Sequence, residues 1–248
     1  MALLGSWGRV IHLNFAPVTV ALLGSGVAAG ADPWLQRGHD AQTSAHFGRS
    51  AARVAETVVA RIERPIFGLK GAVGLYAASD HVNRREFRAY VESRNLPQDF
   101  PGVRGFGFIQ RVPCSALPAF VAAEQREEAP QFALRELAAL SHDELYIGKC
   151  IEPAVPNLTA LGLNLGSEPI RREAVERAMD RGLPTLCAAI TRVQNSHRSA
   201  AVVVFVPVFR LDVDPVTAAQ RRQAPVGVLF APWWWAKCWQ PCRKWRQD

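Results

Sequence analysis

The sequence predicts an α+β fold, in which one long N-terminal helix precedes shorter helices and mostly antiparallel strands. The first observation is that apolar residues recur at three- and four-residue steps over residues 36–78, the spacing of one helix face. The second is that short apolar runs, bounded by Gly, Pro or polar residues, alternate with helical patterns further along the chain. Together these features indicate helices packed on an antiparallel sheet.

Composition supports a globular protein and argues against nucleic acid as a partner. The chain has 248 residues, of which 49% are hydrophobic, so it can bury a sizeable core. Its net charge of +7 comes mainly from arginines scattered among acids, without a basic stripe that carries interleaved aromatics. No nucleic-acid interface is therefore expected.

The long helix is expected to form a stalk over residues 32–78. Its apolar stripe needs a partner, either the domain that follows or the stalk of a second chain in a homodimer or heterodimer. Pro65 lies inside the stripe and should kink or break the helix, because proline lacks a backbone donor and clashes with the preceding turn.

Shorter elements are expected after the stalk. Asn83 and Glu86 have the spacing of a capping box, which predicts a helix beginning with the sequence NRREFRAYVESR. The next predicted elements are a strand over 103–112, a helix over 115–128, and strands over 131–137 and 143–152.

The clearest predicted helix covers residues 166–182, with Ser167 as its cap, Pro169 in its first turn and Gly182 at its end. Proline at residue 207 implies a bulge or a sheet edge in one of the strands that follow. These strands are predicted over residues 185–194, 200–209 and 226–231.

Residues 1–31 are expected to be a membrane anchor or a signal peptide. The run from Val10 to Ala31 has no charged residue and is about long enough to cross a bilayer as a helix. Its last three residues, Ala29 to Ala31, fit a small-x-small cleavage site, so both alternatives remain open. Either alternative predicts that the chain after Asp32 is exported.

The five cysteines do not indicate a metal site. They form no Cys-x-x-Cys pair, and no His lies at zinc-ligand spacing, so neither a metal nor another cofactor is expected. A bridge between Cys150 and Cys187 is possible outside the cytoplasm, whereas buried free thiols are the more common use of such residues.

Three segments occur in a specific order along the chain: FRAYVESRNLPQDFPGVRGFGFIQRVP, FALRELAALSHDELYIGKCIEP and LGLNLGSEPIRREAVERAMDRGLPTL. Together they resemble the CHASE domains of bacterial receptors, over about Ala45 to Ala231. The resemblance implies a sensory domain over residues 79–231, in which the stalk helix leads into two stacked PAS-like lobes. It also implies a small ligand in the membrane-distal lobe.

The resemblance further implies a place in the cell. Members of the family are flanked by membrane helices and lead into a cytoplasmic histidine kinase or nucleotide cyclase. The chain is therefore expected at a bacterial inner membrane, with its sensory domain in the periplasm and a small molecule as its partner. It is not expected to be an enzyme.

Two positions of the ligand site follow from the resemblance. In plant relatives that sense cytokinins, an Asp recognises the adenine edge and a Thr lines the pocket, and by alignment Lys149 and Cys187 stand here in their places. A lysine has donors only, so cytokinin sensing is not supported. Lys149 beside Tyr146 would favour an anionic or aromatic ligand, with a solvated strand lysine as the alternative.

Two further residues complete the predicted ligand site. Glu152 and Arg192 are predicted to form an ion pair that either lines the pocket or is purely structural, the latter being more common. A less favoured alternative is a secreted hydrolase that uses His142, Asp143 or Glu144. The chain lacks the familiar catalytic motifs, which argues against that reading.

The last segment, residues 232–248, is atypical. Five of the seven tryptophans fall after Pro232, three of them in a row at 233–235. A shifted reading frame there would encode Val-Val, so one hypothesis is an out-of-frame tail and a receptor truncated before its output module. The alternatives are a cationic, aromatic tail at the membrane interface, and a non-signalling remnant or heterodimer partner of an intact receptor.

Overall fold

The structure of the chain is a computed structural model. It describes residues 16–79, 81–138, 142–188, 190–194, 197–210 and 215–234. Side chains are described for Ser25 and, within those ranges, from residue 46 to 188, for 201–210 and for 215–233. The chain divides into two compact units, 1–58 and 59–248, and the account below concerns the second unit unless stated.

Helix α1 (Ala16–Ala78) runs without interruption through Pro65, so the predicted break at this proline is absent. Proline removes only one backbone donor, and packing of the turns that follow can offset that loss. Leu69 and Ala72, in these turns, are fully buried against the domain. The tertiary contacts of the last turns therefore keep the helix continuous.

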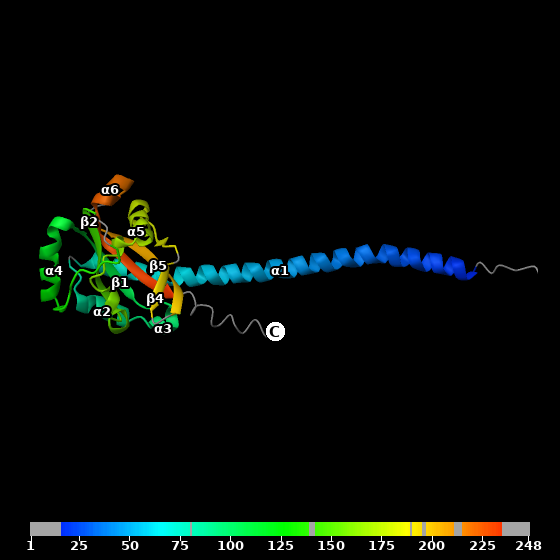
Figure 1. The fold of residues 1–248 in the computed structure, drawn as a ribbon, viewed down its shortest axis with the longest axis horizontal. Coiled ribbons are helices and arrows are strands. Elements are labelled where there is room, and N and C mark those ends of the chain that lie inside the picture. Colours follow the sequence, from blue (N-terminus) through cyan, green and yellow to red (C-terminus); the bar gives the residue numbers. More distant parts are fainter. Residues whose placement is uncertain are drawn as a thin grey trace, which may run out of the picture. The chain divides into compact units, whose positions relative to one another are not determined.

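The remaining elements are short helices and strands (Figure 1). The helices are α2 (Arg84–Glu92), α3 (Leu96–Asp99), α4 (Leu117–Arg126), α5 (Pro169–Arg181) and α6 (Ala218–Gln223), with 3-10 turns η1 (Cys114–Ala116), η2 (Val155–Ala160) and η3 (Leu165–Ser167). The strands are β1 (Phe106–Pro113), β2 (Glu144–Glu152), β3 (Thr185–Leu186), β4 (Ile190–Gln194), β5 (His197–Phe209) and β6 (Pro225–Trp234).

All pairings between these strands are antiparallel. The described strands form one sheet in the order β2-β1-β6-β5-β3, and β4 also pairs with β5. The predicted α+β class with a long N-terminal helix is thereby confirmed. The described residues contain one sheet, and a division into two PAS-like lobes is not confirmed.

Helices cover both faces of the sheet. On one face, Val175 and Met179 of α5 belong to a core cluster with Phe205 and Phe230. On the other face lie a second core cluster and the ends of α1 and α2; its members include Leu69, Phe87, Val91, Phe108, Val204 and Leu229. Successive strand residues point to opposite faces, which explains why Phe108 and Ile109 belong to different clusters.

The capping box predicted before α2 is present. Asn83 accepts a hydrogen bond from the backbone of Glu86, and the Glu86 carboxylate accepts one from the backbone of Asn83. Gly182 ends α5 in the left-handed conformation, also as predicted. The cap predicted for α5, Ser167, is wrong. The Glu168 side chain accepts hydrogen bonds from the first backbone N–H groups of the helix. The Ser167 hydroxyl instead donates to the carbonyl of Asn164.

Two strand predictions differ from the structure. The segment 131–137 is not a strand and makes only an isolated bridge, between Arg135 and Leu163. Its backbone bonds go to the loop at residues 162–164, which leaves no partner strand to extend the pairing. The predicted strand 185–194 is divided into β3 and β4, and both pair with β5.

The irregularity expected from Pro207 falls at the next residues, as a register shift between Val208 and Phe209.

Strand β6 continues through Trp233, whose side chain is 2% exposed. Trp233 also donates from its indole nitrogen to the carbonyl of Pro101 at 3.3 Å. The start of the tryptophan run is therefore part of the sheet.

Candidate functional site

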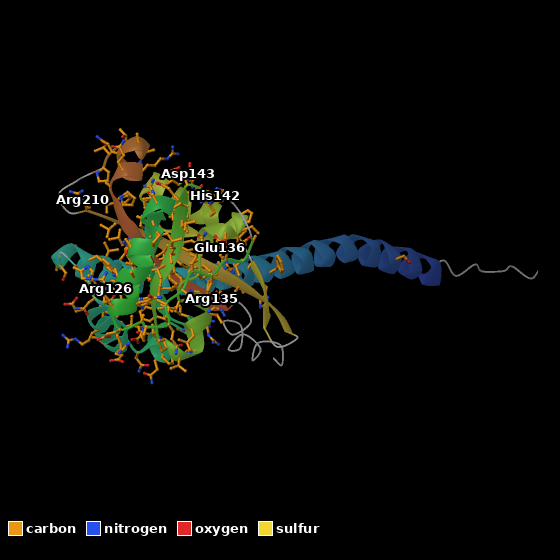
Figure 2. All side chains as sticks on the ribbon, turned by 60° about the vertical axis from the view of Figure 1, so that its left-hand side comes forward. Arg126, Arg135, Glu136, His142, Asp143 and Arg210 are labelled. Atoms are coloured by element: carbon orange, nitrogen blue, oxygen red, sulfur yellow. The ribbon has the colours of Figure 1, made fainter. Side chains whose placement is uncertain are left out.

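The larger of two cavities lined by described residues has a volume of about 590 Å³ and lies on the face of the sheet that α1 and α2 cover. This volume lies within the range of small-molecule sites in proteins, roughly 300–1,000 Å³. Arg210, which is labelled in Figure 2, is exposed and belongs to the residues that line this cavity. The cavity is lined by Tyr76, Ser79, His81, Val82, Phe108, Gln110, Phe120, Ala123, Glu124, Glu127, Lys149, Phe209, Arg210 and Val226.

A chain of ion pairs forms the polar wall of this cavity. Arg84 Nη2 lies 2.6 Å from Glu124 Oε2, and Glu124 Oε1 lies 3.2 Å from Lys149 Nζ. Lys149 Nζ also lies 3.3 Å from Glu127 Oε2. The side chains of Arg84, Glu124 and Lys149 are at most 9% exposed, so each charge depends on its partner for stability.

Glu127 stands at the solvent end of this chain. Burial alone would raise the pKa of its carboxyl, but Lys149, and then His81, lower that pKa overall. Its Oε1 atom lies 3.5 Å from His81 Nε2. The same atom is buried and accepts no hydrogen bond from any residue that the structure describes.

Aromatic rings form the apolar wall. Tyr76, in the last turn of α1, stacks on Phe108 of β1 with ring centroids 4.4 Å apart. Burial strongly raises the pKa of the Tyr76 hydroxyl, and the nearby Cys150 and Glu124 raise it further. Because Tyr76 belongs to the stalk helix, the stalk itself supplies part of the cavity wall.

A second, smaller cavity of about 240 Å³ lies on the other side of Arg84. Arg84 lines it together with Arg88 and Glu152, and the Glu152 carboxylate accepts a hydrogen bond from Arg88 Nε at 3.2 Å. Its volume is below the usual range for organic ligands. Arg84 thus lines the small cavity while its partner Glu124 lines the large one.

The structure separates the predicted ligand residues. Lys149 lines the large cavity and Glu152 the small one. Tyr146 and Cys187 both lie in the core cluster under α5, away from the other two. The side chain of Arg192 lies outside the described residues, and the partner of Glu152 among them is Arg88.

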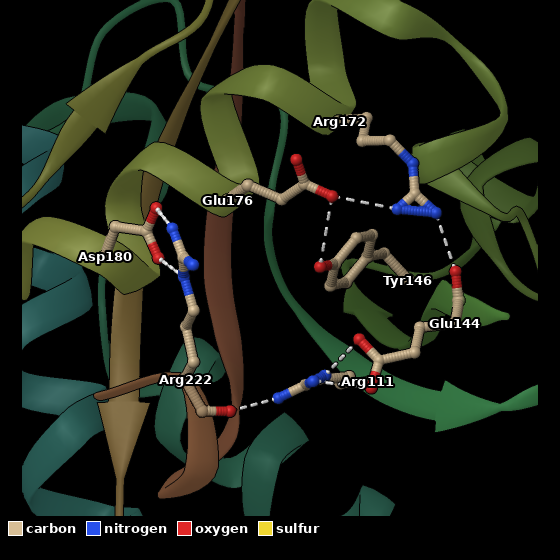
Figure 3. A network of polar contacts seen from close by, with 7 residues as sticks. All are labelled: Arg111, Glu144, Tyr146, Arg172, Glu176, Asp180 and Arg222. Carbon is tan, nitrogen blue, oxygen red and sulfur yellow. Dashed lines mark hydrogen bonds and ion pairs between the residues drawn. The ribbon is translucent and has the colours of Figure 1, made fainter. Parts of the chain in front are cut away.

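Tyr146 is held by a polar network beneath α5 (Figure 3). The guanidinium of Arg172 lies 5.0 Å from its ring centroid, and Glu176 accepts from both Arg172 and the tyrosine hydroxyl. Burial, and next the charge of Glu176, raise the pKa of Tyr146 to about 12. Arg172 also donates to the Glu144 carbonyl. The polar groups of this network therefore already hydrogen-bond one another.

The three residues of the hydrolase alternative are not brought together as a catalytic set. His142 and Asp143 are exposed (Figure 2), and Glu144 is bound by Arg111 through two hydrogen bonds. Within the described part of the chain, no group of His, Cys, Asp and Glu is arranged to hold a metal ion. Cys150 and Cys187 are free thiols in different core clusters, so they form no bridge.

Sequence reasoning missed Arg84, Glu124, Glu127 and Tyr76. Glu124 and Glu127 lie on and just after α4, where acids are expected to face solvent. The signal available was their spacing: Glu124 and Glu127 are three residues apart, the separation at which residues at a helix end share one side. That side turns toward Lys149, a relationship that only the fold reveals.

The fold is an α+β domain with one antiparallel sheet among the described residues. A family model described as the CHASE domain matches residues 80–237, more than half of the chain. The chain belongs to the CHASE domain family, which confirms the resemblance inferred from its three segments. No curated protein matches the chain significantly.

CHASE domains are extracytoplasmic sensory domains for small molecules, and they are not catalytic. The membrane placement expected for residues 10–31 is not confirmed. None of the helices in the described ranges is both long enough and apolar enough to cross a bilayer. Residues 10–15 of that segment lie outside the described residues.

Proposed function

We propose that this chain is the periplasmic small-molecule sensor of a bacterial inner-membrane signalling receptor, and that its ligand binds in the large cavity. The observation that carries the proposal is the composition of that cavity. It combines aromatic walls with a buried lysine and two carboxylates inside a CHASE domain. Ligand sites are typically apolar pockets with a few fixed polar groups, which is the arrangement found here.

The position of Tyr76 supports a route from ligand to stalk. Tyr76 belongs to α1, lines the cavity and stacks on Phe108 of the sheet. A ligand that contacts Tyr76 changes the packing of the last turn of α1 against the domain. Such a ligand biases the stalk only if it binds one arrangement of the helix more tightly than another.

Attachment to the inner membrane rests on the sequence. The uncharged run from Val10 to Ala31 has the length of a membrane span, and the family functions outside the cytoplasm. Fractionation of cells that express the tagged chain tests this part. Recovery in the inner-membrane fraction, with the domain digestible from the periplasm, is expected, and recovery in the cytoplasm would contradict it.

Ligand binding is tested by thermal shift of the full chain against a panel of small acids, amines, zwitterions and sugars. A ligand at one hundred times its Kd stabilises the folded state by about 2.7 kcal/mol. Ala123 lines the cavity from α4, so Ala123→Trp should fill the space and abolish the shift. Ala122→Trp, on the exposed neighbouring position, is the matched control and should retain it.

Two results would overturn the proposal. One is a panel in which no compound raises the melting temperature of the full chain. The other is a compound that still stabilises Ala123→Trp as much as the unmodified chain, since its binding site would then lie elsewhere.

A further inference from the structure

The large cavity holds a cation and an anion side by side, each with unused capacity for hydrogen bonds. A lysine ammonium has three donors, and Lys149 forms ion pairs with Glu124 and Glu127. Glu127 Oε1 is buried and accepts no hydrogen bond from the described residues, although the exposed His81 lies 3.5 Å from it. The ligand therefore meets one available donor and one available acceptor in the same cavity.

The two available groups are close together. Lys149 Nζ lies 3.3 Å from Glu127 Oε2, so the ammonium and the carboxylate are in contact. Gln110, on β1, also lines the cavity, and its amide makes no hydrogen bond to any residue that the structure describes. An amide both donates and accepts, so Gln110 can complete the binding of either charged end of a ligand.

Ligands with a single charge fit this arrangement poorly. A monoanion that takes Lys149 from Glu127 leaves that partly buried carboxylate with the exposed His81 as its neighbour, and a monocation on Glu127 draws that carboxylate from Lys149. Separating a charge from its partner in such a partly buried site is unfavourable. A zwitterion avoids this cost, because its carboxylate binds Lys149 while its ammonium binds Glu127.

The rest of the cavity indicates what the zwitterion carries. Its walls include the rings of Tyr76, Phe108, Phe120 and Phe209, which offer apolar surface to a side chain. Aromatic rings favour a flat or apolar partner that removes their surface from water. Tyr76 belongs to α1, so a ligand side chain packed among these rings contacts the element that would transmit the signal.

We propose that the ligand is a free α-amino acid with an aromatic or aliphatic side chain. Its carboxylate binds Lys149 and Gln110, its ammonium binds Glu127, and its side chain packs among the aromatic rings. The proposal rests on the proposed function, because it assumes that the large cavity is the ligand site.

The test is titration calorimetry on the full chain with L-phenylalanine and L-leucine as probes. The matched analogues are phenylpropanoate, which lacks the ammonium group, and phenethylamine, which lacks the carboxylate. At least one of the two amino acids should bind saturably. Each analogue of a binding probe should bind about tenfold to one-hundredfold more weakly, since each lacks one charged hydrogen-bonding group.

Substitutions locate the two charged ends. Glu127→Gln keeps the shape of the side chain and should weaken amino-acid binding about tenfold or more, while Gln110→Leu should weaken it less. Glu92→Gln, on the exposed side of α2, is the control and should bind as the unmodified chain does. Melting curves of each variant confirm that it is folded.

The outcomes separate this proposal from the proposed function. If phenylpropanoate binds as tightly as L-phenylalanine, or if only a non-amino-acid compound binds and Ala123→Trp abolishes it, the ligand class is wrong and the sensor function stands. If amino acids bind but Glu127→Gln has no effect, the assigned geometry is wrong. If neither amino acids nor any panel compound binds, both proposals fail.

Discussion

Arg84 and Glu124 are joined at 2.6 Å in the interior, so that the first residue of α2 is tied to the last turn of α4. Removing Arg84 leaves Glu124 buried with Lys149 as its remaining cation, so the cost should be smaller than that of a fully unpaired buried charge. We expect Arg84→Met to lower the free energy of unfolding by about 1–3 kcal/mol, measured by urea titration of the full chain.

Arg85 provides the matched control, because it is the next residue of α2 and is exposed. Arg85→Met should change the unfolding free energy by less than about 0.5 kcal/mol. If Arg84→Met is as stable as Arg85→Met, the buried chain of ion pairs does not contribute in the way described.

Gly162 is the second test of the fold, since it has a φ of +71° and lies against the loop at Ala133. A Cβ atom at this position would meet the Ala133 carbonyl oxygen, which belongs to the backbone and cannot turn aside. Conformational strain and overpacking together predict a loss of about 2–4 kcal/mol for Gly162→Ala.

Gly74→Ala is the opposite case on α1. A Cβ atom there has no neighbour within 4 Å, and alanine favours the helix by about 0.5–1 kcal/mol. We expect a small gain in stability for Gly74→Ala in the same urea titration. Equal effects of the two substitutions would contradict the backbone conformation assigned to Gly162.

Asp180 and Arg222 give a prediction on pH. Arg222 donates to both carboxylate oxygens of Asp180, at 2.6 and 2.7 Å, and these bonds hold the pKa of Asp180 below its ordinary value of 3.8. A carboxyl group with a lowered folded pKa contributes stability above its unfolded pKa, and this contribution is lost as the pH falls through the folded pKa. Asp180→Asn should therefore destabilise the chain at about pH 6, with the difference shrinking below about pH 3.8.

The measurement is the urea midpoint of both proteins across that range. Asp143→Asn, at an exposed position, serves as the control and should show no such convergence. A gap between Asp180→Asn and the unmodified chain that stays constant on acidification would show that the charge of Asp180 does not contribute.

The cysteines differ in reactivity. Burial raises the pKa of the Cys150 thiol to about 12, and the thiolate is the form that reacts with alkylating agents. At about pH 8, iodoacetamide should modify the exposed Cys114 in the folded chain, and Cys150 and Cys187 only after denaturation. Peptide mass mapping identifies the modified sites, and rapid modification of Cys150 in the folded chain would refute its burial.

Local signals in the sequence predicted local structure well. Asn83 and Glu86 predicted the start of α2 because a capping box depends on residues three apart. The strand predicted over 143–152 corresponds to β2, whose polar boundaries are equally local. The strand predicted over 131–137 was wrong because a strand needs a neighbouring strand. No local pattern shows that the backbone hydrogen bonds of this segment go to the loop at 162–164.

The candidate site was only partly predictable for the same reason. Lys149 was selected by alignment with the family, and the structure places it in the large cavity. Its partners Glu124 and Glu127 come from a helix more than twenty residues earlier, so their pairing depends on how α4 packs on the sheet. Tyr146 is close to Lys149 in sequence but belongs to the core cluster under α5.

The central position of β6 has a consequence for synthesis of the chain. β6 pairs with β1 on one side and with β5 on the other. The two halves of the sheet therefore cannot join until residues 225–234 have left the ribosome. Until then β1 and β5 each present an open strand edge, and open edges recruit strands from other chains. If the chain crosses a membrane unfolded, as the proposed function implies, these edges form only after β6 is available to pair with both of them.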